Sequence, residues 1–243
     1  MIEVSLTAPV LRLSINRPEK KNALDNEHYR ELTKQLIQAD LNPDVLVIWL
    51  QGAGGDFTAG NDIKDFLKSP PTGPESPVLQ FMTALRELKK PLVVMLEGAV
   101  VGIGCSMLLH ADLVYASKTA VFQMPFVNLG LVPEFGLSYL LPRLVGPLKA
   151  KELLLLGRPF GADEALSYGL VNQVFDPQNL EKETQDRVNA LAAQPAEAVW
   201  LAKKLISQAQ EPQLSEAIGR EILVFKQRLQ SPEALKAFQQ FLG

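Results

Sequence analysis

Cysteine is nearly absent from this sequence of 243 residues, which contains one, Cys105. A single cysteine excludes an intrachain disulfide and is typical of a protein that folds in a reducing compartment. Only two histidines are present, and neither has cysteine or acidic neighbours at a spacing typical of metal ligands, so we expect no metal site. The first residues contain neither a basic stretch nor an apolar core typical of a secretory signal, and we therefore expect a cytoplasmic location.

Long hydrophobic runs and an excess of one charge are also absent. The longest apolar stretch, residues 92–109, is interrupted by Glu97 and by three glycines, which makes it a poor membrane span. The formal net charge of −3 gives no electrostatic reason to expect nucleic acid or an anionic membrane as a partner. With 47% hydrophobic and 21% charged residues, the composition is that of an ordinary globular protein.

The apolar pattern predicts alternating strands and helices in the first half of the chain. Asn26 is a candidate N-cap for the first helix. From about residue 134 onward the pattern predicts helix after helix, with one short strand at residues 171–175. Such an order indicates an α/β core with mostly parallel strands, followed by a helical C-terminal region. The predicted strands are residues 11–15, 45–50, 92–96, 113–115 and 120–122, and the predicted helices are residues 26–39, 78–88, 103–110, 148–156, 180–193, 196–208, 214–229 and 232–241.

Two segments place glycines directly beside the end of a buried strand, FTAGNDIKDF at residues 57–66 and EGAVVGIGCS at residues 97–106. Glycine allows the backbone to approach a ligand closely and to adopt a positive φ. The first N–H groups of a helix are unpaired and favour negative charge. Each segment alone is more simply explained as a tight turn, but two such ends that face one another would form an oxyanion hole. Neither segment has the spacing of a dinucleotide-binding or P-loop motif.

Taken together, the two segments resemble those of the crotonase (enoyl-CoA hydratase/isomerase) superfamily, and the similarity extends in the same order over nearly the whole chain. The further blocks that carry it are NRPEKKNAL at 16–24, DLVYAS at 112–117, AVFQMP at 120–125, LGLVP at 129–133, GRPF at 157–160, ADEA at 162–165 and GLVN at 169–172. The resemblance implies an α/β fold with a crotonase-like (ββα) repeat core over residues 1–190. It also implies a helical trimerisation region over residues 191–243, and therefore a homo-oligomer, either a trimer or a hexamer.

The resemblance further implies an acyl-CoA thioester as substrate, with coenzyme A as part of the substrate and no separate cofactor. The oxyanion hole would consist of the backbone N–H groups of Asn61, after Gly60, and of Ile103, after Gly102, with no use of the side chains at 61 and 103. Such a hole typically contributes about 10²–10³ in rate per donor. For Lys20 and Lys64, a solvated surface role is equally expected. The positions expected to bind the substrate or its coenzyme A are Lys20, Ala23, Ala59, Gly60, Asp62, Ile63, Lys64, Gly102, Ser106 and Phe126.

The catalytic group departs from the hydratase pattern. Hydratases of this superfamily position one water with two glutamates, and this chain has Ser106 and Phe126 at those places. Glu134 lies a few residues further on and resembles the catalytic glutamate of peroxisomal-type 3-enoyl-CoA to 2-enoyl-CoA isomerases. One carboxylate can remove a proton from C2 and return it at C4. The apolar neighbours Val132 and Phe135 are expected to desolvate Glu134 and raise its pKa. The simpler explanation of Glu134 is an acid in the first turn of a helix.

Three functions follow from these residues. The first is an enoyl-CoA isomerase with Glu134 as its base. The second is an enoyl-CoA hydratase or another enolate-forming enzyme of the superfamily, such as a thioesterase or a decarboxylase. The third is a catalytically silent homologue that binds acyl-CoA.

Overall fold

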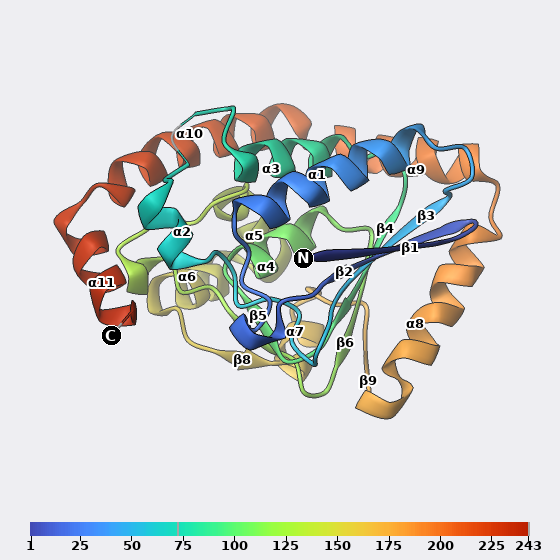
Figure 1. Ribbon diagram of the computed structural model, residues 1–243, viewed down its shortest axis with the longest axis horizontal. Coiled ribbons are helices and arrows are strands. Elements are labelled where there is room, and N and C mark those ends of the chain that lie inside the picture. Colours follow the sequence, from blue (N-terminus) through green and yellow to red (C-terminus); the bar gives the residue numbers. More distant parts are fainter. Residues whose placement is uncertain (72, 243) are drawn as a thin grey trace.

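The computed structural model describes residues 1–71 and 73–242, so Thr72 in the proline-rich stretch and Gly243 at the end of the predicted helical region lie outside it. A six-stranded sheet forms the centre, in the order β1-β2-β3-β4-β6-β9 (Figure 1). β1 and β2 are antiparallel, and the other neighbours are parallel. The strands are β1 (Ile2–Thr7), β2 (Val10–Ile15), β3 (Val47–Gly52), β4 (Leu92–Leu96), β6 (Leu113–Ser117) and β9 (Gln173–Phe175).

Both faces of this sheet are covered, which explains why its central strands consist of uninterrupted apolar residues. Side chains alternate along a strand, so Ile48 and Leu50 belong to one core cluster while Val47 and Trp49 belong to another. The first cluster lies under α1 (Asn26–Leu41) and α3 (Pro77–Glu87), and the second lies under α8 (Pro177–Ala192). The mixed α/β architecture predicted from the sequence is confirmed.

The N-cap of α1 is Asp25, whose side chain accepts hydrogen bonds from the backbone N–H groups of Glu27 and His28. The prediction that Asn26 caps this helix is therefore wrong by one residue. An aspartate carboxylate also matches the positive end of the helix dipole. Within α1, Tyr29 is buried with 1% of its surface exposed, and its hydroxyl donates a hydrogen bond to Asn61 in the first glycine segment.

A second, three-stranded sheet consists of β5 (Ala99–Val101), β7 (Val121–Gln123) and β8 (Phe160–Gly161), in the order β5-β7-β8. Only two residues separate the end of β4 from the start of β5, so the chain passes directly from the large sheet into the small one. This junction also carries the second glycine segment. The small sheet therefore positions that segment.

The remaining helices cover the small sheet and the edge of the large one. The helix predicted at 103–110 is divided into α4 and the 3-10 helix η2, and α5 was not predicted because Pro142 lies inside it. These elements are η1 (Pro18–Lys20), α2 (Ile63–Lys68), α4 (Ile103–Ser106), η2 (Met107–His110), η3 (Val127–Leu129), α5 (Leu137–Val145), α6 (Pro147–Leu156), α7 (Ala162–Ser167), α9 (Ala196–Gln208), α10 (Glu211–Leu229) and α11 (Pro232–Leu242).

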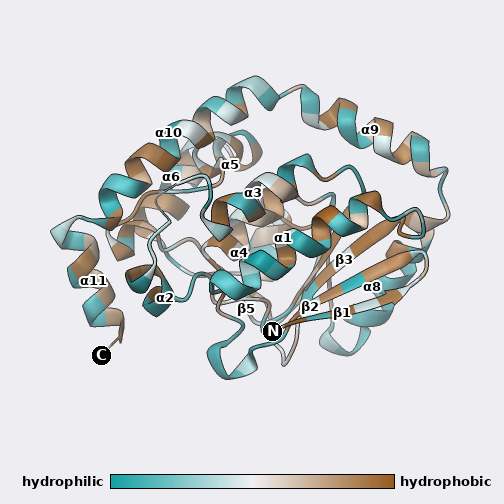
Figure 2. Cartoon of the chain, turned by 45° about the horizontal axis from the view of Figure 1, so that its top comes forward, coloured by the Kyte–Doolittle hydropathy of each residue, from teal (hydrophilic) through white to brown (hydrophobic). Residues whose placement is uncertain are grey.

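The C-terminal helices are of two kinds. α10 and α11 contribute Leu214, Phe225 and Phe238 to the main core cluster, so they share a hydrophobic core with the α/β part. α9 instead contains no buried residue and extends away from the body of the molecule (Figure 2). Its apolar residues Leu201 and Leu205 have 52% and 70% of their surface exposed.

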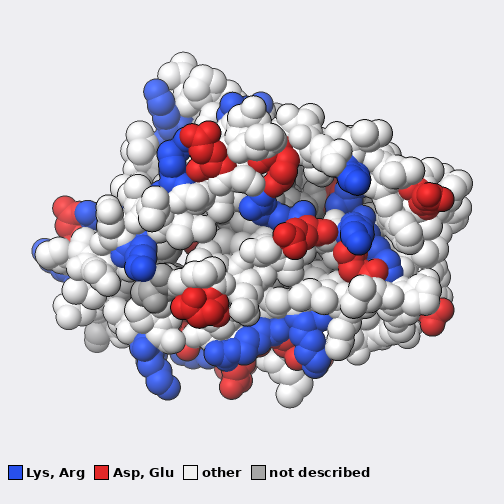
Figure 3. Space-filling view, turned by 90° about the horizontal axis from the view of Figure 1, so that it is seen from above, with Lys and Arg blue, Asp and Glu red and all other residues white. Residues whose placement is uncertain are grey.

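Charges of both signs alternate over the surface seen from above, without one large patch of a single sign (Figure 3). This distribution agrees with the small net charge of −3. Across residues 1–71 and 73–242, no helix combines the length and the apolar character that crossing a lipid bilayer requires.

Candidate active site

The two glycine segments lie side by side, as their positions after buried strands suggest. The N–H of Thr58 donates to the carbonyl of Ala99 at 2.9 Å, and the N–H of Val101 donates to the carbonyl of Thr58 at 3.0 Å. Gly60 has φ 87°, and a Cβ at that position would lie 2.9 Å from the carbonyl oxygen of Val101. Only glycine therefore allows this close approach of the two segments.

The N-terminal block fixes the first glycine segment from its other side. The Asn22 side chain, with 0% of its surface exposed, donates to the carbonyls of Ala53 and Asp56 at 2.8 and 2.6 Å. Leu24 then pairs with the segment, because its N–H donates to Gly60 and its carbonyl accepts from the residue after Asn61, both at 2.8 Å. In such a parallel bridge the N–H of Asn61 itself points away from Leu24 and stays available.

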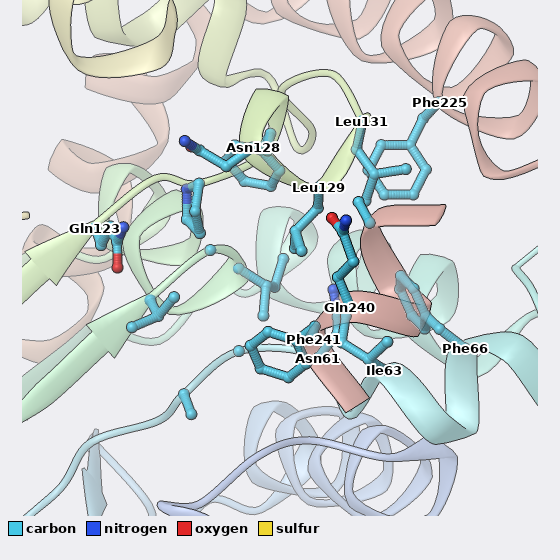
Figure 4. A pocket seen from close by; sticks show the side chains of 18 residues that line it. Asn61, Ile63, Phe66, Gln123, Asn128, Leu129, Leu131, Phe225, Gln240 and Phe241 are labelled. Carbon is cyan, nitrogen blue, oxygen red and sulfur yellow. The ribbon is translucent and has the colours of Figure 1, made fainter. Parts of the chain in front are cut away.

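A cavity of about 540 Å³ lies where the two segments meet, within the usual size of small-molecule sites. Asn61 and Ile103 both line it (Figure 4). Within the described part of the chain, the backbone N–H groups of these two residues have no hydrogen-bond acceptor. Ile103 is the first residue of α4, where an unpaired N–H is expected. Two free backbone donors therefore belong to the wall of one cavity.

The structure gathers about half of the predicted site residues around this cavity and leaves the rest outside it. Ser106 is fully buried, but its hydroxyl donates to the carbonyl of Gly102 at 3.3 Å and does not reach the cavity. Asp62 caps α2 by accepting from the N–H of Lys64 and pairs with Arg17 at 2.9 Å. Lys20 and Lys64 are exposed. The predicted residues that line the cavity are Ala59, Gly60, Asn61, Ile63, Gly102, Ile103 and Phe126, and those that do not are Lys20, Ala23, Asp62, Lys64, Ser106 and Glu134.

Much of the cavity wall comes from residues that the sequence did not single out. Gln123 lies at one end of the cavity and Phe225 at the other (Figure 4). α11 contributes Ala237, Gln240 and Phe241. The amphipathic pattern of residues 232–241 predicted a helix with one apolar face, but not which surface that face would cover.

Glu134 lies behind the cavity wall, with 6% of its surface exposed. It borders a separate small cavity of about 20 Å³, together with Glu221 and Phe225. Phe225 lines both cavities, so its ring stands between the substrate-sized space and the carboxyl group. Glu134 precedes α5 by three residues, which excludes the explanation that it is an acid in a first helical turn.

Burial and, after it, the nearby Glu221 raise the pKa of Glu134 from 4.5 to about 8, while the Asn61 side chain opposes both. The direction agrees with the desolvation expected from its apolar neighbours. Oε1 of Glu134 has no hydrogen-bond partner among the described residues. A buried carboxyl group with so few donors favours its protonated form.

The Asn61 side chain connects this carboxyl group to the cavity. Its Oδ1 accepts a hydrogen bond from the hydroxyl of Tyr29, and the same side chain acts on Glu134 to lower the pKa of that carboxyl group. That the backbone N–H at position 61 serves the oxyanion hole stays a prediction. Tyr29 lies on α1, 32 residues earlier in the chain, so the sequence alone did not indicate this contact.

Acidic residues are missing from the large cavity itself. No aspartate or glutamate is found among the described residues that line it. Nor do three or more His, Cys, Asp or Glu side chains come together as a possible metal site anywhere in residues 1–71 and 73–242. The buried carboxyl group that acts on Asn61 from behind this cavity is Glu134.

Comparisons with known proteins agree with this arrangement. A family model described as enoyl-CoA hydratase/isomerase matches residues 6–243. The human protein "Enoyl-CoA delta isomerase 2" is 34% identical over 241 residues, which are 96% of this chain and 61% of that protein. The "Short-chain-enoyl-CoA hydratase" of Clostridium acetobutylicum is 32% identical over 235 residues, covering 95% of this chain and 90% of that protein.

The structure of Pseudomonas aeruginosa OdaA matches with a TM-score of 0.96 and 40% identity, covering 99% of this chain and 98% of that one. The chain thus spans about three fifths of the length of the human relative. Relatives with isomerase names and with hydratase names occur at similar identity, so the reaction must be argued from the site.

Proposed function

The chain belongs to the enoyl-CoA hydratase/isomerase family, and we propose that it is an isomerase that converts 3-enoyl-CoA thioesters into 2-enoyl-CoA thioesters. One observation carries the proposal. A single buried carboxyl group, Glu134, lies next to the side chain of Asn61, and Asn61 also lines the cavity. The proposed base and the proposed oxyanion donor are therefore neighbours.

The reaction needs only one base. The thioester oxygen accepts hydrogen bonds from the N–H groups of Asn61 and Ile103, which stabilises the negative charge of an enolate. Polarisation of the carbonyl acidifies C2, and ionised Glu134 removes a proton there. The same carboxyl group returns the proton at C4, so the double bond moves into conjugation and Glu134 ends the cycle ionised, as it began.

The acyl group reaches Glu134 past Phe225. This ring borders both cavities and makes an edge-on contact with Phe66, with 6.4 Å between ring centroids. In the proposed complex the acyl chain lies against the two rings and displaces Phe225 from in front of the carboxyl group. The apolar wall also excludes water, which keeps the enolate from other reactions.

The coenzyme A end is assigned to the opposite side of the first glycine segment. Ala59 and Ile63 line the cavity, and Asp62, between Asn61 and Ile63, is the N-cap of α2. The exposed Lys20 ends η1 and the exposed Lys64 lies in the first turn of α2. The bridge between Leu24 and Asn61 joins the segments next to these two helices. We assign them, with Ala23, to the phosphates and the nucleotide of coenzyme A, since a flexible ammonium group suits a phosphate that remains partly solvated.

Hydration is the second candidate function, because Glu134 and Glu221 border a cavity of about 20 Å³, enough for one water molecule. The Clostridium hydratase named above is also a relative. Against it, Glu221 already accepts three hydrogen bonds from Gly136 and Ser138. The hydratase positions Ser106 and Phe126 carry no acid. Isomerisation is therefore favoured.

The exposed apolar face of α9 supports self-association. Leu201, Leu205 and Ile206 have 52, 70 and 74% of their surface exposed, and α9 buries none of its residues in the single chain. We assign this face to contact with further copies of the chain in a trimer or a hexamer. A cytoplasmic location stays a prediction from the sequence.

The test uses the purified protein with a 3-enoyl-CoA and, separately, with a 2-enoyl-CoA. Isomerisation predicts a conjugated product of unchanged mass from the first substrate, abolished by Glu134→Gln. Addition of one water to the second substrate at a comparable rate would instead support hydration. If neither is turned over while acyl-CoA still binds, the chain is a silent binding homologue.

A further inference from the structure

The turn that carries Glu134 has a backbone conformation that must be held by its surroundings. Phe135 has φ 60° and Gly136 has φ 77°, so two successive residues are left-handed. For glycine this costs little, but for a residue with a Cβ the left-handed conformation costs roughly 1–2 kcal/mol. Strain of this kind, directly beside an active carboxyl group, persists only where neighbours fix the turn.

Two side chains fix this turn from opposite sides. Nε2 of His110 donates to the carbonyl of Phe135 at 2.8 Å, and the two rings stack with 3.8 Å between their centroids. The Glu221 carboxylate accepts the N–H of Gly136 at 2.6 Å and the N–H of Ser138 at 2.8 Å, and it also accepts the Ser138 hydroxyl. Glu221 thereby caps α5, whose own N-cap residue, Gly136, has no side chain that could do so.

Glu221 is also a second buried carboxyl group beside Glu134. It has 7% of its surface exposed and borders the same cavity of about 20 Å³. Two carboxyl groups so placed in a low-dielectric site do not both ionise readily, and the one with more donors keeps the charge. Glu221 accepts three hydrogen bonds, whereas Oε1 of Glu134 has no partner in the described residues.

We propose that Glu221 is the positioning residue of Glu134: it fixes the turn that presents Glu134 and places a second carboxyl group beside it at the same small cavity. The inference rests on the proposed function, in which Glu134 is the base. It deepens that function because a base with a pKa near the working pH can both remove and return a proton efficiently.

The other ionisable groups around the pair do not account for this effect. His110 has its pKa lowered to about 4 by burial, so it is neutral. Tyr29, on α1, has its pKa raised well above 10 and is also neutral. Asp25 and Asp65 act on Tyr29. Burial raises the pKa of Glu221, and its hydrogen bonds with Ser138 and Gly136 and the nearby Arg220 oppose this rise. Glu221 is the one charged group that acts on Glu134.

The direct test measures the ionisation of both glutamates by ¹³C NMR of their side-chain carboxyl groups. Glu134→Gln and Glu221→Gln identify which resonance belongs to which glutamate. Glu221→Gln removes the charge and keeps one of the two oxygens that accept from Gly136 and Ser138. We expect the pKa of Glu134 to fall by about one unit or more in this variant, so that about tenfold more of it is ionised at pH 6. Glu216→Gln, an exposed glutamate on the same helix, should change nothing.

Glu134→Gln provides a second measurement if Glu221→Gln fails to fold. Protonated Glu134 carries no charge while Glu221 titrates, so the neutral glutamine of Glu134→Gln should leave the pKa of Glu221 unchanged. Unchanged titration of Glu134 in Glu221→Gln, or a lowered pKa of Glu221 in Glu134→Gln, would overturn the inference.

Turnover separates this inference from the proposed function. In Glu221→Gln we expect the acidic limb of the kcat/KM profile to move to lower pH with KM nearly unchanged. If the protein has no isomerase activity, the NMR titrations still decide whether the two glutamates are coupled. If it is an isomerase whose pH profile is the same in wild type and Glu221→Gln, the function stands and the positioning role fails.

Discussion

Replacing Glu134 by glutamine is expected to stabilise the fold while it removes turnover. The folded protein holds Glu134 with a pKa of about 8, against 4.5 for the ordinary group. One pKa unit corresponds to about 1.4 kcal/mol. At a pH where Glu134 is ionised in both states, the shift therefore lowers the free energy of unfolding by about 3–5 kcal/mol. Glutamine has the same shape and no charge to bury, so it avoids this cost.

The sign of the effect fixes its pH window. Below pH 4.5 the carboxyl group is protonated in both the folded and the unfolded state, and Glu134 costs nothing. As the pH rises, the unfolded state releases its proton first, so the wild type loses stability until the pH passes about 8. The advantage of Glu134→Gln should therefore grow between these two values and be constant above them.

Urea unfolding of the wild type and of Glu134→Gln between pH 4 and 9, at one protein concentration, measures this difference. Glu216→Gln on the surface of α10 is the matched control and should follow the wild type. A stability difference between wild type and Glu134→Gln that does not vary with pH would refute the buried, protonated state of Glu134.

Three further predictions concern the cavity, the hydrogen-bond chain and the surface of α9. Gly60→Ala should lower kcat/KM about 10²–10³-fold in steady-state kinetics, because its Cβ would displace the Asn61 amide. Gly55→Ala, with the same φ of 87° but open space around it, should leave kcat/KM unchanged. Similar losses in both variants would contradict the proposed oxyanion hole. Tyr29→Phe removes the hydrogen bond to Asn61 and should lower stability by about 1 kcal/mol and kcat several-fold at unchanged KM; unaltered kcat would count against a role for this contact. Leu205→Glu should shift the protein toward monomers in sedimentation velocity with an unchanged circular dichroism spectrum, and an unchanged oligomeric state would exclude this face as the contact.

The sequence predicted those parts of the fold whose signals are local. β4 consists of five buried apolar residues between polar ends, and the pattern predicted its bounds. β1 was missed, because five of its six residues are exposed and only Ile2 is buried, which gives an edge strand no apolar pattern. Ile37 follows buried Leu36 in the first helix and is itself apolar, yet it has 51% of its surface exposed, since periodicity does not fix where a buried face ends.

The site was predictable where the backbone provides the chemistry. Glycines beside strand ends indicated the cavity wall at Gly60 and Gly102, because only glycine fits such positions. Contacts between side chains that are far apart in the sequence produce no comparable local pattern. Glu221 meets Gly136 across 85 positions, and Phe225 reaches the cavity from the same helix. A polar residue within an amphipathic helix gives no sign that it is buried.

The most direct test of the account is a single turnover of a 3-enoyl-CoA that carries deuterium at C2. One buried carboxyl group that both removes and returns the proton predicts that part of the deuterium appears at C4 of the 2-enoyl product, and that Glu134→Gln forms no product. A C4 hydrogen drawn entirely from solvent, unaltered turnover in Glu134→Gln, or a product that contains one added water would contradict the proposal that Glu134 is the single base of an isomerase.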